Sequence, residues 1–317
     1  MLPSDFPVPI AAPDLKNHID AGGESLWGPY IRRGHRTLFS AHPKTGKTTL
    51  IAHVLRGMRH GGYLAGEITR GTALIVTEES NRLWALRAEK LVLGDHIHVV
   101  GKNMLSEWGW NDLCWGIAYI SEKNKYDVVV IDTFAAFAKL EDENNSAQVT
   151  LAMNALQPIM TLNTAIVLIH HCRKSGGQRG LGVRGSTAIT ANPDILLEMG
   201  FTNKADRNEG QGGRRHRKLY LESRFDDIEP TIIELAKDGR TYVETSRSQI
   251  IARLLPEGPP GLLPEEVLEL WPEGYDRPKS AKSLAVSLVG GEKEYRLWEH
   301  TGGGIKGSPC RYYRARI

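Results

Sequence analysis

The chain has 317 residues, of which 41% are hydrophobic and 24% are charged, values that suit a globular protein with one large domain and a smaller one. The formal net charge of +3 does not by itself indicate a polyanion partner, so such an interaction must depend on local clusters of charge. The cysteines lie far apart without a CxxC pair, no apolar run approaches the roughly 18 residues of a membrane span, and the amino terminus lacks a signal-peptide pattern. The sequence therefore predicts a cytoplasmic protein without membrane association.

The predicted elements alternate along most of the chain. Residues 1–25 are rich in proline and polar side chains and predict an irregular N-terminal arm. A hairpin is expected over 30–41, with 36–41 as its second strand. Further strands are expected at 71–80, 96–100, 126–137, 164–172 and 192–199, and helices at 45–61, 81–94, 110–124 and 146–163. This alternation predicts an α/β domain over 26–244 with a mainly parallel sheet flanked by helices, which the runs at 218–225 and 231–245 extend in antiparallel fashion.

The texture changes near residue 245. Three short helical segments at 246–258, 262–274 and 278–291 precede two strands joined by a glycine turn, which predicts a small winged-helix-like domain over 245–317. From Asp276 onward there are nine Lys or Arg and four Asp or Glu residues. Lys279 and Lys282 stand in the first turns of the expected recognition helix, and the wing strand carries "RYYR". Such modules bind DNA or dock proteins, and the sequence leaves both roles open.

The segment "AHPKTGKT", residues 41–48, matches the phosphate-loop pattern GxxxxGK[ST], except that Ala41 replaces the first glycine. It follows an expected strand and opens an expected helix, where backbone N–H groups attract phosphate. Lys47 is expected to reach the β- and γ-phosphates of ATP, and Thr48 to bind Mg²⁺. The expected nucleotide-binding residues are Ala41, His42, Pro43, Lys44, Thr45, Gly46, Lys47, Thr48 and Thr49. A chance GKT in an ordinary strand–turn–helix is the alternative.

Carboxylates end two other expected strands. Asp132 can hold Mg²⁺ together with the Thr48 hydroxyl. Glu78 and Glu79 end the preceding strand, where one carboxylate can orient and deprotonate an attacking water. We expect Glu78 to do so, which leaves Glu79 to cap the helix that begins near Asn81. The alternatives are a loop-capping aspartate and a solvated acidic turn.

Five segments in chain order resemble the RecA-like P-loop ATPases of the replicative-helicase group: "AHPKTGKTTL", "TEES", "VVVIDTF", "LIHHCRKSGG" and "VRGSTAITANPDILLEM". They are most similar to the plasmid RepA-type hexameric helicase family (AAA_25-like), over roughly residues 25–243. The resemblance implies a ring or filament with ATP and Mg²⁺ between neighbouring subunits. It implies that Lys47 and Thr48 form the P-loop pair, Glu78 is the catalytic glutamate and Asp132 the magnesium aspartate. It also places a γ-phosphate sensor at His170, although a strand end with one buried and one exposed histidine is the plain alternative; a metal site there is not expected, because adjacent side chains of a strand point to opposite faces.

The resemblance further implies residues that contact DNA and a neighbouring subunit. The segment 173–185 occupies the place of the family's DNA-binding loop and carries Arg173, Lys174, Arg179 and Arg184 among five glycines, without an acidic residue. A flexible solvated loop is the alternative, and Arg184 could instead contact the nucleotide. Arg224 matches the arginine that family members extend into the ATP site of a neighbour. Glu222 stands where the family has a lysine, which leaves half of that pair in doubt unless Arg217 or Lys218 compensates, and a surface ion pair is the alternative for Arg224.

The preferred hypothesis is an ATP-driven motor on single-stranded DNA, a hexameric DNA helicase of the replicative type. The alternative is an ATP-dependent DNA-binding switch, such as a replication initiator, loader or recombination mediator without unwinding activity. Both hypotheses allow a protein partner in replication or recombination. A small-molecule P-loop kinase is disfavoured, because the large basic loop is present and a lid-like arginine pattern is absent from the sequence.

Overall fold

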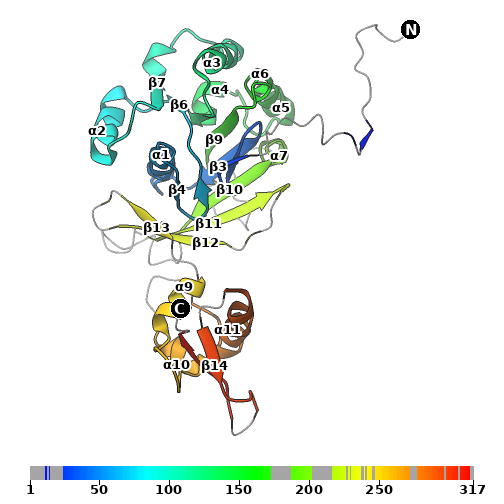
Figure 1. Ribbon diagram of the computed structural model, residues 1–317. Coiled ribbons are helices and arrows are strands. Elements are labelled where there is room, and N and C mark those ends of the chain that lie inside the picture. The colour runs from blue at the N-terminus through cyan, green and yellow to red at the C-terminus, as the bar shows by residue number, and fades with distance from the viewer. Residues whose placement is uncertain are drawn as a thin grey trace.

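The structure of the chain, a computed structural model, describes residues 11, 12, 14, 24–172, 187–201, 216–225, 228, 230–236, 239, 241–244, 247–271, 277–295, 298–305 and 308–314. Within these residues, nine strands form one central sheet in the order β13-β12-β11-β10-β3-β9-β8-β6-β7 (Figure 1). Their bounds are β3 Arg36–Ala41, β6 Ala73–Thr77, β7 Ile97–Gly101, β8 Val128–Asp132, β9 Ala165–His171, β10 Ile195–Gly200, β11 His216–Ser223, β12 Thr231–Leu235 and β13 Tyr242–Glu244.

The sheet is parallel over its larger part. The strands β10, β3, β9, β8, β6 and β7 run in the same direction, whereas β11, β12 and β13 pair in antiparallel fashion. Every residue of β6 and β8 is buried, as expected for strands that are covered on both faces. The α/β sheet expected from the sequence, with its antiparallel end, is therefore confirmed.

Helices cover both faces of this sheet. The helices α1 (Lys47–Gly57) and α2 (Asn81–Leu91) pack against one face, and the other face carries α3 (Trp110–Asn124), α4 (Phe134–Ala138), α5 (Ser146–Asn154), α6 (Gln157–Met160) and α7 (Thr187–Ala191) (Figure 1). A 3-10 turn, η2 (Lys102–Met104), follows β7. The single helix expected over 146–163 is interrupted between α5 and α6, because Pro158 has no N–H to continue the helical ladder.

A second, smaller sheet lies beside α1. It contains β1 (Ser25–Trp27), β2 (Ile31–Arg32), β4 (Gly62–Tyr63) and β5 (Glu67–Ile68) in the order β2-β1-β5-β4. The hairpin expected over 30–41 is wrong, because β2 pairs with β1 rather than with β3. Trp27 and Tyr30 are fully buried against α1 in the core of that face, and this burial directs β2 away from the central sheet.

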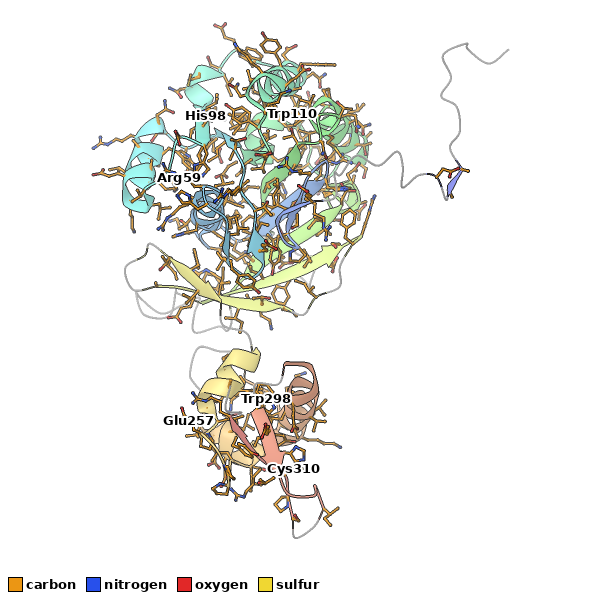
Figure 2. The ribbon with its side chains drawn as sticks, viewed as in Figure 1. Arg59, His98, Trp110, Glu257, Trp298 and Cys310 are labelled. Carbon is orange, nitrogen blue, oxygen red and sulfur yellow. The ribbon has the colours of Figure 1, made fainter. Side chains whose placement is uncertain are left out.

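The C-terminal elements surround a core of their own. They are α9 (Arg247–Leu254), α10 (Pro264–Glu269), α11 (Ala281–Tyr295), β14 (Trp298–Thr301) and β15 (Arg311–Arg314), and β14 pairs antiparallel with β15. Trp298 is 1% exposed and donates its indole N–H to the Leu288 carbonyl oxygen (Figure 2). Three helices followed by a strand pair is the order expected from the sequence, and the winged-helix assignment and the domain boundary near 245 stay predictions.

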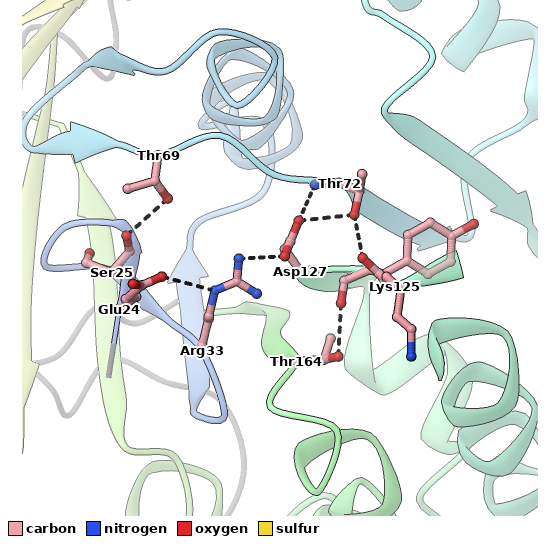
Figure 3. Close-up of polar contacts among 9 residues, drawn as sticks. Glu24, Ser25, Arg33, Thr69, Thr72, Lys125, Asp127 and Thr164 are labelled. Atoms are coloured by element: carbon pink, nitrogen blue, oxygen red, sulfur yellow. Dashed lines mark hydrogen bonds and ion pairs between the residues drawn. The ribbon is translucent and has the colours of Figure 1, made fainter. Parts of the chain in front are cut away.

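One polar network joins the two sheets of the N-terminal part. Arg33, which follows β2, forms an ion pair with Asp127 at 2.5 Å and approaches Glu24 at 3.9 Å (Figure 3). Asp127 in turn accepts hydrogen bonds from the backbone N–H and the hydroxyl of Thr72. These residues precede β6 and β8, so the network lies at the amino-terminal edge of the parallel strands.

Within the described part of the chain, no helix has both the length and the apolar character needed to cross a membrane.

Candidate active site

The segment between β3 and α1 adopts a tight loop over the N-terminus of α1. Gly46 has a φ of 102°, a left-handed conformation that glycine adopts without strain, and Lys44 has a φ of 62°. The Ala41 carbonyl oxygen accepts hydrogen bonds from the Lys47 ammonium and from the Cys172 N–H. The His42 carbonyl accepts the Thr45 N–H at 3.3 Å. The loop expected from the sequence is therefore present, with Thr45 buried, Pro43 and Lys44 exposed, and Thr49 in the first turn of α1.

Lys47 lies at the centre of the loop. Its side chain is 6% exposed, and Nζ lies 3.0 Å from the Ala41 oxygen and 3.3 Å from Nδ1 of His171. Burial lowers the pKa of Lys47, and the nearby Asp132 carboxylate opposes that shift. A lysine at the base of a backbone loop, next to a carboxylate, is the arrangement needed to bind a phosphate chain.

Asp132 and Thr48 meet at the carboxyl end of the parallel strands. The Thr48 hydroxyl donates a hydrogen bond to Oδ2 of Asp132 at 2.8 Å. Burial raises the pKa of Asp132 to about 6, and the Thr48 hydrogen bond acts in the opposite direction. A hydroxyl and a buried carboxylate supply the hard oxygen ligands that Mg²⁺ prefers, so these two residues fit the ion.

The adjacent glutamates have different environments. Glu79 forms two hydrogen bonds to Arg87, at 2.6 and 3.3 Å, and Arg87 lies over the Trp84 ring at 4.4 Å. Glu78 is exposed, accepts a hydrogen bond from the Thr133 hydroxyl at 3.2 Å, and donates its backbone N–H to the Asp132 carbonyl oxygen. Glu78 is therefore the glutamate that faces the Asp132 side of the site.

The expectation that Glu79 caps the following helix is wrong. The N-cap of α2 is Ser80, whose side chain accepts the Leu83 N–H. Serine is a favoured N-cap residue because its short side chain reaches the backbone N–H groups of the first turn.

The two histidines that end β9 point to opposite faces of the sheet. His170 is 1% exposed and lies near the Phe134 ring, on the face covered by α3 to α7. His171 lies on the α1 face, where its Nδ1 approaches the Lys47 ammonium at 3.3 Å. Strand alternation thus places His171, rather than the expected His170, beside the phosphate loop, and a γ-phosphate sensor role for either histidine stays a prediction.

Sequence motifs did not place two residues of the antiparallel strands against the loop. The Nε–H of Arg217 donates a hydrogen bond to the Thr45 carbonyl oxygen at 2.7 Å. Tyr242 packs edge-on against the His53 ring of α1, and its hydroxyl lies over Gly46. The alternating apolar pattern of β11 around the buried Arg217 was the available signal, because a charged residue on a core-facing position needs a partner.

Arg224 lies away from the phosphate loop of its own chain. It follows β11 at the amino-terminal edge of the parallel strands, is 63% exposed, and forms an ion pair with Asp194 at 3.3 Å. Glu222 is exposed on the same strand. The contact of Arg224 with a neighbouring subunit therefore stays a prediction.

The expected DNA-binding residues fall into two groups. Arg173, Lys174, Arg179 and Arg184 lie outside the described residues. Lys279 and Lys282 are exposed at the start of α11.

The wing strand β15 uses its side chains inside the C-terminal module. Tyr312 is 2% exposed, Arg311 bonds to Glu266 at 3.2 Å, and the Tyr313 hydroxyl donates to Glu299. Arg314 reaches the Leu255 carbonyl oxygen. Within the described part of the chain, no cluster of three or more His, Cys, Asp or Glu residues is arranged to hold a metal ion.

The fold and this site define a RecA-like P-loop ATPase. The sequence matches the AAA_25 family model, described as an AAA domain, over residues 13–177, which is more than half of the chain. The protein therefore belongs to this family.

Solved structures share the fold. A KaiC-like protein from the hyperthermophilic archaeon Pyrococcus horikoshii OT3 is similar with a TM-score of 0.50 and 15% identity, covering 71% of this chain and 97% of that one. The isolated ATPase domain of another protein is similar with a TM-score of 0.51 and 12% identity, covering 68% of this chain and 86% of that one. No curated protein matches the sequence.

Proposed function

We propose that this ATPase is a ring-forming DNA helicase of the replicative type, which uses ATP hydrolysis to move on single-stranded DNA. The observation that carries the proposal is the end of β9. There, His171 lies 3.3 Å from the Lys47 ammonium and the Cys172 N–H bonds to the Ala41 carbonyl oxygen. The chain then continues directly into the basic, glycine-rich segment 173–185.

Each residue of the site has a chemical role in this proposal. Residues 41–49 surround the phosphates, and Lys47 binds the β- and γ-phosphates. Thr48 and Asp132 hold Mg²⁺, which neutralises charge on the transferring phosphoryl group when it is bound. Glu78 orients and deprotonates the attacking water. Arg224 of a neighbouring subunit stabilises the charge of the transition state, which implies a closed ring, for which we propose six subunits.

Coupling to DNA follows from the chain path. The arginines and lysine of segment 173–185 neutralise the phosphates of a single strand, and its glycines permit close approach of the backbone. Because β9 contacts the phosphate loop just before this segment, a change of nucleotide can alter its position. The resemblance of the site motifs to the replicative-helicase group supports this function.

The experiment is ATP-dependent strand displacement on a forked duplex, at equal ATP hydrolysis by each active variant tested. The proposal predicts displacement by the wild type, loss of displacement in Lys47→Ala, and assembly of the active species as a ring in electron micrographs. DNA-dependent ATP hydrolysis without displacement on any fork would overturn the helicase and favour the second candidate. That candidate, a DNA-binding switch such as an initiator, loader or recombination mediator, is favoured by Glu222 at the position where the family has lysine.

A further inference from the structure

The phosphate loop is held from the antiparallel end of the sheet. Leu219 of β11 pairs with Met199 of β10, which is level with Ala41 at the end of β3. Leu219 faces the α1 side of the sheet. Arg217 is two residues earlier in the antiparallel strand, so its side chain points to the same face, one step beyond the end of β3.

Arg217 is fixed in this position by its surroundings. Its side chain is 6% exposed, its Nε–H donates to the Thr45 carbonyl oxygen at 2.7 Å, and its Cζ lies 4.7 Å from the centroid of the Phe201 ring. A hydrogen bond from a buried guanidinium to a carbonyl oxygen is stronger than one between neutral groups. The planar guanidinium can stack on an aromatic ring and donate from its edge at the same time, which a lysine cannot do.

The geometry of the peptide unit connects this bond to the nucleotide site. In a trans peptide, the carbonyl of one residue and the N–H of the next point in opposite directions. By holding the Thr45 carbonyl, Arg217 therefore fixes the direction of the Gly46 N–H. A second side chain restrains the same residue, because a Cβ on Gly46 would lie 3.7 Å from the Tyr242 hydroxyl.

We propose that Arg217 is a positioning residue for phosphate binding. It draws the Thr45 carbonyl into the protein, so that the Gly46 N–H faces the phosphates of the nucleotide, and its charge adds positive potential beneath the loop. It acts through the Thr45–Gly46 peptide rather than by contact with phosphate. The inference rests on the proposed nucleotide-binding role of residues 41–48, and it assigns to β11, outside the sequence motifs, a part in setting nucleotide affinity.

The test compares Arg217→Gln, Arg217→Lys, Arg33→Gln and Lys47→Ala in the full-length chain. The dissociation constant of ADP·Mg²⁺ is measured by isothermal titration calorimetry, and the thermal midpoint is recorded with and without ADP·Mg²⁺. Arg33→Gln is the matched control, because Arg33 also forms a largely buried polar contact, to Asp127, but at the opposite edge of the sheet. Arg217→Lys keeps the charge and most of the bulk, so it decides the question if Arg217→Gln does not fold.

Arg217→Gln is expected to raise the dissociation constant about tenfold, which corresponds to the loss of one hydrogen bond to a charged group. It should also reduce the increase in thermal midpoint caused by ADP·Mg²⁺. Arg217→Lys should show a smaller rise, and Arg33→Gln none. Unchanged affinity in the folded Arg217 variants, with Lys47→Ala impaired, would overturn the inference alone. Unchanged affinity in Lys47→Ala would instead overturn the assignment of the phosphate loop.

Discussion

Glu78 and Glu79 differ in their environments, although they are adjacent in the sequence. Arg87 binds Glu79 through two hydrogen bonds, whereas Glu78 contacts Thr133 on the Asp132 side of the site. We predict that Glu78→Gln lowers kcat for ATP hydrolysis by about 10²- to 10³-fold, because it removes the general base. The dissociation constant for ATP should change little, since the carboxylate acts on the water rather than on the bound phosphates.

Glu79→Gln is the control for that measurement. Its main consequence should be a weaker contact with Arg87, and kcat should fall far less than in Glu78→Gln. Steady-state hydrolysis and equilibrium nucleotide binding measured on both variants separate the two effects. A larger loss of kcat in Glu79→Gln would reverse the assignment of the two glutamates.

Asp132 makes the stability of the metal-free protein dependent on pH. Burial raises its pKa from 3.8 to about 6, so the folded protein holds this proton more tightly than the unfolded chain does. The contribution of Asp132 to the free energy of unfolding therefore falls as pH rises from 3.8 to about 6, and stays low above that pH. We predict that Asp132→Asn stabilises the metal-free protein at about pH 8 by on the order of 2 kcal/mol.

The same substitution should abolish magnesium-dependent ATP hydrolysis, because the amide is a poor ligand for Mg²⁺. Urea unfolding of both proteins without Mg²⁺ provides the test. The stability difference should disappear at about pH 4, where Asp132 is largely protonated in the folded protein. A difference that is equal at both pH values would exclude the titration of Asp132 as its cause.

Residue-level prediction from sequence succeeded where a motif fixes the position and was incomplete where strand orientation decides. Lys47, Thr48 and Asp132 meet as expected, because the motif and the strand end determine where they lie. The sequence "HHC" does not reveal which histidine faces α1, and only the register of β9 against β3 places His171 there. The roles of these residues in catalysis stay predictions.

At the level of elements, the Arg33–Asp127 ion pair joins the small sheet to the central sheet. The two side chains are 22% and 19% exposed, and Asp127 also binds Thr72 ahead of β6. We predict that Arg33→Ala lowers the free energy of unfolding by about 2 kcal/mol, less than for a fully buried pair because water reaches both partners. Chemical denaturation measures the change, and KM for ATP should stay at the wild-type value, because the phosphate loop lies at the other edge of the sheet.

A control for this prediction is Arg59→Ala. Arg59 lies outside the network that links Arg33, Asp127 and Thr72, so its removal should cost less stability. Equal losses in the two variants would show that the ion pair adds nothing specific to the connection between the sheets.

The long strands were predictable and the small sheet was not. Continuous apolar runs such as residues 128–131 indicate strands buried on both faces. The strands β1, β2, β4 and β5 have only two or three residues each, too few to show an alternating pattern. They form because Trp27, Tyr30 and Ile68 pack against α1, a tertiary contact that local sequence does not report.

At the level of the whole molecule, the structure narrows the candidate DNA contacts of the C-terminal module. Arg311, Tyr312 and Tyr313 are engaged within the module, whereas Lys279 and Lys282 are exposed at the start of α11. We predict that the double variant Lys279→Ala/Lys282→Ala weakens binding to duplex DNA and reduces the slope of log K against log salt by about 2. Hydrolysis of ATP without DNA should not change.

Fluorescence anisotropy over a range of salt concentrations measures that slope. The matched control is Lys102→Ala/Lys123→Ala, which removes two exposed lysines from the surface of the ATPase part. An unchanged slope in Lys279→Ala/Lys282→Ala would indicate that the C-terminal module docks a protein rather than DNA.

The measurement that tests the central claim most directly is the steady-state rate of ATP hydrolysis with and without single-stranded DNA, for the wild type and for Lys47→Ala. The account predicts strong stimulation of the wild type by DNA and loss of hydrolysis in Lys47→Ala under both conditions. Wild-type hydrolysis that is indifferent to single-stranded DNA would contradict a DNA-driven motor. Hydrolysis that survives in Lys47→Ala would contradict the assignment of residues 41–48 as the phosphate loop.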